Sequence, residues 1–124
     1  MFVRKVAARL KANTLPEFIN IIEKGILPWL REQEGFVDLI VLAMRGSDEV
    51  ATISFWEHEA DAEAWATNGF PEATERLEKI LDGRSYVKTF DVLSSTVHEG
   101  VRTAQARPEC SARELDQVLS DGAN

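Results

Sequence analysis

The aromatic residues between Ile53 and Ala73 are the side chains of this chain best placed for chemistry on an apolar ligand. Trp56 ends a β-branched and aromatic run that indicates a strand, and Trp65 lies in the acidic, alanine-rich stretch that follows, which is typical of a helix. Phe70 comes shortly afterwards. Aromatic rings at the end of a strand and on the next helix can line a cavity, and they can equally fill a core.

Metal and nucleophile chemistry find little support in the sequence. The two histidines, His58 and His98, lack the spacing of a metal-binding motif, so we expect no metal site. The single Cys110 cannot form an internal disulfide or a cysteine-based metal cluster. Neither a G-x-S-x-G motif nor a glycine-rich phosphate loop occurs. The sparse cysteine content fits a reducing, cytoplasmic location.

Length and charge narrow the classes of partner. With 124 residues and 44% apolar content, the chain has the size of one domain with a modest core. Its net charge of −7 and its scattered basic residues argue against a nucleic-acid surface. The first residues do not have the form of a signal peptide, and no run approaches the roughly 20 apolar residues of a membrane span.

Hydrophobic periodicity predicts the element order strand, helix, strand, strand, helix, strand. The strands are expected over residues 2–11, 36–44, 50–56 and 85–94, with a hairpin turn over 45–49. Thr14 and Glu17 have the form of a capping box that opens the first helix, and Pro28 should kink or divide it. Gly69 should break the second helix in two.

This order predicts an α+β fold: a ferredoxin-like βαββαβ subunit with a four-stranded antiparallel sheet. Helices cover one face of such a sheet, yet these strands offer apolar side chains to both faces. We therefore expect a second copy of the chain to cover the other face, so that a homodimer forms an α/β barrel. Residues 1–96 make up the predicted domain. Residues 97–124 form a predicted arm with a possible short helix from Ser111.

The stretch Ser54-Phe-Trp-Glu57, the helix that carries Trp65, and Phe70-Pro-Glu-Ala73 resemble the antibiotic biosynthesis monooxygenase family of small dimeric α/β barrels. The resemblance covers about residues 1–96. It implies a cofactor-independent monooxygenase that acts on a small aromatic or quinol-like substrate. In that chemistry the deprotonated substrate itself gives an electron to oxygen, so no metal and no cofactor are expected. The protein supplies a dry cavity and donors for an oxyanion.

Members of this family use Asn, Trp, Tyr and Arg side chains at the site. Carried over to this sequence, Trp65 keeps the helix Trp, and Asn68 lies one turn beyond it. Tyr86 at the start of the last strand and Arg9 on the first strand are the candidate donors. Each has a structural alternative: Trp65 can be core, and Asn68 can simply end its helix before a glycine.

Two other functions stay open. The haem-degrading branch of the superfamily uses an Asn in the first strand and an axial His on the second helix, where this chain has Ala8 and Thr74. Thr cannot replace imidazole as an axial ligand, so the resemblance implies haem chemistry only weakly. A non-catalytic module that holds a small apolar ligand is the second alternative.

Overall fold

The computed structural model describes residues 1–98. The chain divides into two compact units, Met1–Val92 and Leu93–Asn124, and the fold and site below belong to the first. The predicted domain boundary at residue 96 stays a prediction. The helix predicted from Ser111 lies outside the described residues.

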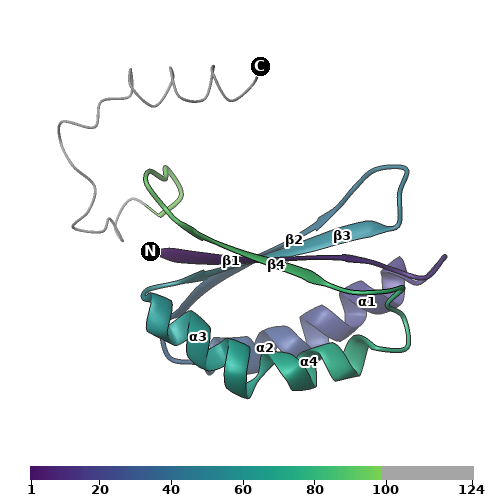
Figure 1. Cartoon of the computed structure of the whole chain (residues 1–124), viewed down its shortest axis with the longest axis horizontal. Helices are drawn as coiled ribbons and strands as arrows, with labels where there is room; N and C mark the ends of the chain where they lie inside the picture. The colour runs from purple at the N-terminus through teal and green to yellow at the C-terminus, as the bar shows by residue number, and fades with distance from the viewer. Residues whose placement is uncertain (99–124) are drawn as a thin grey trace. The chain divides into compact units, whose positions relative to one another are not determined.

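Four antiparallel strands form one sheet with the spatial order β2-β3-β1-β4 (Figure 1). The strands are β1 Phe2–Arg9, β2 Phe36–Ala43, β3 Glu49–Trp56 and β4 Tyr86–Asp91. The continuous apolar run of β2 and the alternation in β1 and β4 predicted these elements to within a few residues. Central β1 pairs with both β3 and β4, so its side chains lie in the middle of each face of the sheet.

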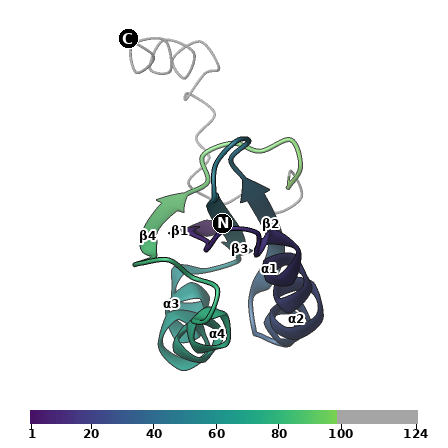
Figure 2. The same cartoon turned by 90° about the vertical axis from the view of Figure 1, so that its right-hand side faces the viewer.

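The helices that the structure describes all pack on one face of this sheet, as Figure 2 shows. The helical segments are α1 Leu15–Ile21, the π-helical η1 Ile22–Ile26, α2 Leu27–Arg31, α3 Glu59–Asn68 and α4 Phe70–Leu77. The chain therefore has the predicted ferredoxin-like α+β fold. Within the described residues, no helix has the length and apolar character needed to cross a membrane.

The first helix is divided as predicted, but the capping box is wrong. The Thr14 hydroxyl donates to the carbonyl of Lys11 at 2.7 Å and makes no cap with the helix. A nearby backbone carbonyl thus competes successfully for the hydroxyl. Pro28 follows the π-helical turn of η1 within a helical backbone that continues through Ile26 and Leu27, so its missing N–H removes one hydrogen bond at the change from η1 to α2.

The second helix breaks at Gly69, between α3 and α4. The backbone of Gly69 has φ −115° and ψ −41°, which any residue can adopt. Glycine is required here for a different reason: a Cβ atom at this position would overlap Cζ3 and Cε3 of the Trp65 indole. The break between α3 and α4 and the packing of the Trp65 indole therefore both depend on Gly69.

The core lies between the sheet and the helices and is centred on Trp56, which is fully buried. Its indole Nε1 donates to the Ser54 hydroxyl at 2.9 Å, and that hydroxyl donates to the Arg4 carbonyl at 3.2 Å. The Trp56 ring packs edge-on against Phe36 and stacks near Trp65, at centroid distances of 5.5 and 6.4 Å. The sequence left open whether Trp56 lines a cavity or fills the core, and in the structure it lies in the core.

The other face of the sheet carries large apolar side chains that are exposed in the single chain. Ile40 and Leu42 on β2, and Tyr86 and Phe90 on β4, are 41% to 67% exposed. These residues share one face because side chains alternate along a strand and the paired registers keep that alternation aligned.

Candidate functional site

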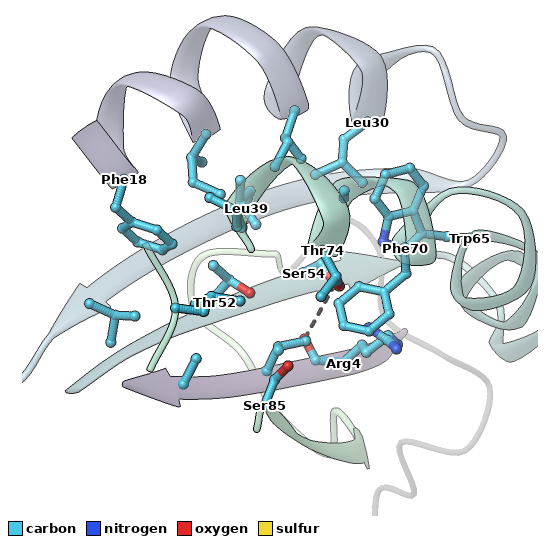
Figure 3. A pocket seen from close by; sticks show the side chains of 18 residues that line it. Arg4, Phe18, Leu30, Leu39, Thr52, Ser54, Trp65, Phe70, Thr74 and Ser85 are labelled. Atoms are coloured by element: carbon cyan, nitrogen blue, oxygen red, sulfur yellow. Dashed lines mark hydrogen bonds between the residues drawn. The ribbon is translucent and has the colours of Figure 1, made fainter. Parts of the chain in front are cut away.

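An apolar cavity of about 70 Å³ lies between the sheet and the helices (Figure 3). Its floor is the helix-facing side of β1 and β3, with Val6 and Thr52 paired across the two strands. Its walls come from the first helical segments, through Phe18 and Ile22, and from α4. Ile22 and Ile26 are four residues apart, so they lie on the same side of the helix, and both are buried.

Trp65 forms one side of this cavity. Its side chain is 5% exposed and extends from α3 toward the sheet, beside Phe70 of α4 (Figure 3). Trp29 of α2 packs edge-on against the Trp65 ring at a centroid distance of 4.9 Å. Contacts from α2 and Gly69 thus fix the indole plane, so Trp65 serves as a rigid wall and as part of the core at once.

Arg4 is the charged side chain of the cavity. It is 7% exposed although it carries a guanidinium, and it lies on the helix-facing side of central β1. Its Cζ atom lies 4.1 Å from the centroid of the Phe70 ring, which is a cation–π contact. Burial lowers the pKa of Arg4 from its ordinary value.

No hydrogen bond or ion pair joins the Arg4 guanidinium to another residue in the described part of the chain. The ion pairs found there are Arg9–Glu49, His58–Asp61 and Arg76–Glu72. A guanidinium has five N–H donors, and buried donors are ordinarily satisfied. Arg4 therefore brings a positive charge without an ion-pair partner among the described residues to the edge of an otherwise apolar space, and its nitrogens keep some access to water.

Four hydroxyl groups complete the polar part of the lining, from Thr52, Ser54, Thr74 and Ser85. The Ser54 hydroxyl is held by its bonds to Trp56 and to the Arg4 carbonyl, the second of which Figure 3 shows as a dashed line. The lining holds no Asp, Glu, Lys or His among the residues that the structure describes. Hydroxyls can orient a ligand oxygen, but they are poor proton acceptors at neutral pH.

The structure does not bring the four predicted site residues together. Trp65 lines the cavity, whereas Asn68 is exposed near the end of α3. Arg9 and Tyr86 line a separate, open hollow of about 780 Å³ on the other face of the sheet. Arg9 donates there to Glu49 at 3.0 Å, and Tyr86 is 67% exposed. The roles predicted for Asn68, Arg9 and Tyr86 stay predictions.

Sequence reasoning missed Arg4, although a signal for it was present. The residues of the first strand that share the side of Arg4 are Phe2, Val6, Ala8 and Leu10, all apolar. A lone charge on the apolar side of a central strand indicates a buried charge, and buried charges cluster at functional sites.

The cavity does not fit haem. Ala8 and Thr74, the residues at the two positions that distinguish the haem-degrading branch, both line it. The described lining offers no His, Cys, Met or Tyr as an axial ligand. Within the described residues, no cluster of three or more His, Cys, Asp or Glu side chains is placed to hold a metal ion.

A model of known protein families matches residues 1–82, and its description is antibiotic biosynthesis monooxygenase. This chain belongs to the antibiotic biosynthesis monooxygenase family. The matched residues run from β1 past α4 and include Arg4, Trp65 and Gly69, but they end before Tyr86. Among curated protein sequences, none matches significantly.

Solved structures of several proteins share the fold at low sequence identity. A monooxygenase from the gene ActVA-Orf6 of Streptomyces coelicolor, in complex with nanaomycin D, is 21% identical, with a TM-score of 0.66 over 76% of this chain and 88% of that one. SnoaB, a cofactor-independent oxygenase from Streptomyces nogalater, is 18% identical, with a TM-score of 0.62 over 77% and 95%. NE2512, a protein of unknown function from Nitrosomonas europaea, is 14% identical, with a TM-score of 0.65 over 77% and 91%.

Proposed function

We propose that this chain is a cofactor-independent monooxygenase that oxygenates a small aromatic or quinol-like substrate in the cavity beside Trp65. The observation that carries the proposal is an apolar cavity in a chain of this family, lined by Phe18, Trp65 and Phe70 and with the Arg4 cation at its edge. Asn68, Arg9 and Tyr86 are not required by this proposal.

The chemistry needs an electron-rich substrate anion and molecular oxygen. For a hydroquinone the balance is C₆H₆O₂ + O₂ → C₆H₄O₃ + H₂O, which gives a hydroxyquinone, and for the activated methylene group of anthrone it is R₂CH₂ + O₂ → R₂C=O + H₂O. The substrate supplies all four electrons, one oxygen atom stays in the product, and the other leaves as water. The apolar walls exclude bulk water from the anion, and the Arg4 guanidinium and nearby hydroxyls stabilise negative charge on its oxygen.

The size of the cavity supports a small substrate. Pockets for drug-sized ligands have roughly 300–1,000 Å³, well above the 70 Å³ found here. A monocyclic hydroquinone is therefore a better candidate than a bicyclic or tricyclic compound, and its binding requires some separation of α1 and α4, because a cavity that holds benzene has about 150 Å³.

The second part of the proposal is a homodimer formed through the open sheet face. Ile40, Leu42 and Phe90 would leave water if the sheets of two copies packed face to face, and burial of apolar area favours such association. The hollow that holds Arg9 and Tyr86 would then lie between subunits. The cytoplasmic location inferred from the sequence stays a prediction.

A non-catalytic ligand-binding role is the second candidate. The observation in its favour is that the described lining contains no carboxylate or imidazole to accept a proton from a substrate. Such a protein would hold a small apolar ligand and never consume oxygen.

Oxygen uptake by chelator-treated protein separates the two candidates. The assay measures uptake with a series of hydroquinones and anthrone, after subtraction of the rate without protein. The wild type should accelerate uptake, and Trp65→Phe should keep the fold but lose most of the acceleration. No substrate-dependent acceleration by the wild type, together with saturable binding of the same compounds, would leave the ligand-binding role.

A further inference from the structure

The charge of Arg4 has no counterpart within its own cavity. It is the single charged residue among the described lining residues, and no described carboxylate forms an ion pair with it. The remaining polar lining groups are neutral hydroxyls. The guanidinium nitrogens keep some access to water, so water satisfies them before a ligand binds and an anionic ligand oxygen could take its place.

Phe70 compensates this charge only in part. The ring lies on one side of the guanidinium, at 4.1 Å from its Cζ atom, and the attraction acts through the ring face. The N–H donors at the edge of the guanidinium stay without a partner among the described residues. A planar, forked donor of this kind matches a carboxylate or another anionic oxygen.

From the unpaired Arg4, the apolar walls and the absence of a described proton acceptor, we infer that the cavity binds its ligand as a preformed, singly charged anion with a compact apolar ring, the anionic oxygen on the Arg4 guanidinium. This deepens the proposed function and rests on it for the claim that the cavity is the ligand site. It also assigns Arg4 as the specificity-determining residue of that site.

The inference explains how a cavity without a protein base could serve oxygenation. An ionisable substrate enters as its anion, or it loses its proton to water while Arg4 stabilises the charge that remains. The cavity would then select the reactive ionised form rather than create it with a protein base. A permanent carboxylate would satisfy Arg4 as well but would not be activated toward oxygen.

Calorimetric titration with 4-nitrophenol and its neutral isostere 4-nitroaniline tests this inference. The titrations use the full chain without oxygen turnover, at a pH where 4-nitrophenol is largely ionised. Because a hydrogen bond to a charged group contributes more than a neutral one, the wild type should favour the phenolate by roughly 10- to 100-fold. Arg4→Met should bring the two affinities together, while Arg45→Met, the same change at an exposed turn, should leave the preference intact.

Two further readouts keep the test decisive. The visible band of the phenolate should persist in the bound wild-type complex at a pH where the free probe is mainly neutral. Benzoate should bind with the same dependence on Arg4. If Arg4→Met does not fold, the phenolate band of the wild-type complex decides alone. Equal affinity of the wild type for both nitro compounds, or a bound probe in its neutral form, would overturn the inference.

Failure of this inference is distinguishable from failure of the proposed function. Anion preference without oxygen uptake would support the inference and remove the monooxygenase. Oxygen uptake with no anion preference would support the monooxygenase and overturn the inference. If neither nitro compound binds the wild type, the cavity is not the ligand site, and the inference falls.

Discussion

Gly69→Ala should damage this protein through Trp65 and not through the backbone. The φ of −115° suits alanine, so the substitution brings no conformational strain. The new Cβ atom would overlap two atoms of the indole six-membered ring and lie 3.0 Å from a third, Cη2. Carbon atoms ordinarily pack at about 3.5–4.0 Å, so the ring must shift, and Trp29 blocks one side at a centroid distance of 4.9 Å.

Overpacking of this kind costs about 1–3 kcal/mol, offset by up to ~1 kcal/mol from the lower backbone entropy of alanine in the unfolded chain. The net loss is roughly 0–3 kcal/mol, and about 1.5 kcal/mol at the middle of that range. It should lower the Tm by several degrees, because 1 kcal/mol shifts a domain of this size by about 4–8 °C. Differential scanning calorimetry and near-ultraviolet circular dichroism of the indoles would measure the loss and the ring shift.

Gly25→Ala is the matched control, since its Cβ atom would meet only Arg76 Nη1 at an ordinary 3.7 Å. It should be neutral or slightly stabilising. In a Trp65→Leu background, Gly69→Ala should cost less than in the wild type, because the crowding atoms are gone. The explanation is wrong if Gly69→Ala behaves like Gly25→Ala, or if its cost is the same in both backgrounds.

Four other substitutions test separate parts of the structure. Arg4→Met should change the free energy of unfolding by less than about 1 kcal/mol in denaturant titrations, because the guanidinium keeps some access to water and its loss also removes the contact with the Phe70 ring. Since the lowered pKa of a cation makes stability pH-dependent only above the folded-state pKa, this change should be constant across neutral pH. Trp56→Phe should cost about 2–4 kcal/mol in the same assay, through a lost indole bond to Ser54 and a new cavity. Thr14→Ala should change the Tm little, because its hydroxyl makes no helix cap. Ile40→Asp should convert a dimer to a monomer in light scattering, whereas Leu15→Asp, at similar exposure on the helical layer, should not.

The fold could be predicted because it depends on signals that repeat along the chain. Alternation in β1, the apolar run of β2 and the breaks at Pro28 and Gly69 each act over many residues or through the backbone. Thr14 shows the limit of such reasoning. Thr14 and Glu17 match the sequence pattern of a capping box, but the Thr14 hydroxyl donates to the Lys11 carbonyl instead. No sequence pattern indicates which of these two hydrogen bonds forms.

Of the four predicted site residues, Trp65 lines the cavity, and the site itself stays a prediction. Arg4 and Arg9 lie on the same strand but on opposite sides of the sheet, because their positions differ by an odd number. The registers pair Tyr86 with Ala7 and Arg4 with Ser54, which puts Tyr86 on the open face and Arg4 on the helix-facing one. Choosing between the two arginines required knowledge of which face the helices cover, and that depends on long-range packing.

The measurement that tests the central claim most directly is oxygen-isotope incorporation from ¹⁸O₂ by chelator-treated wild-type protein. The substrate is the hydroquinone or anthrone that gives the fastest uptake, and mass spectrometry reads the product. A monooxygenase that needs no cofactor should place one ¹⁸O atom in each product molecule and release the other as water, and Trp65→Phe should abolish most of that product. A product that carries oxygen from water alone, or no product despite tight binding in the cavity, would contradict the proposal.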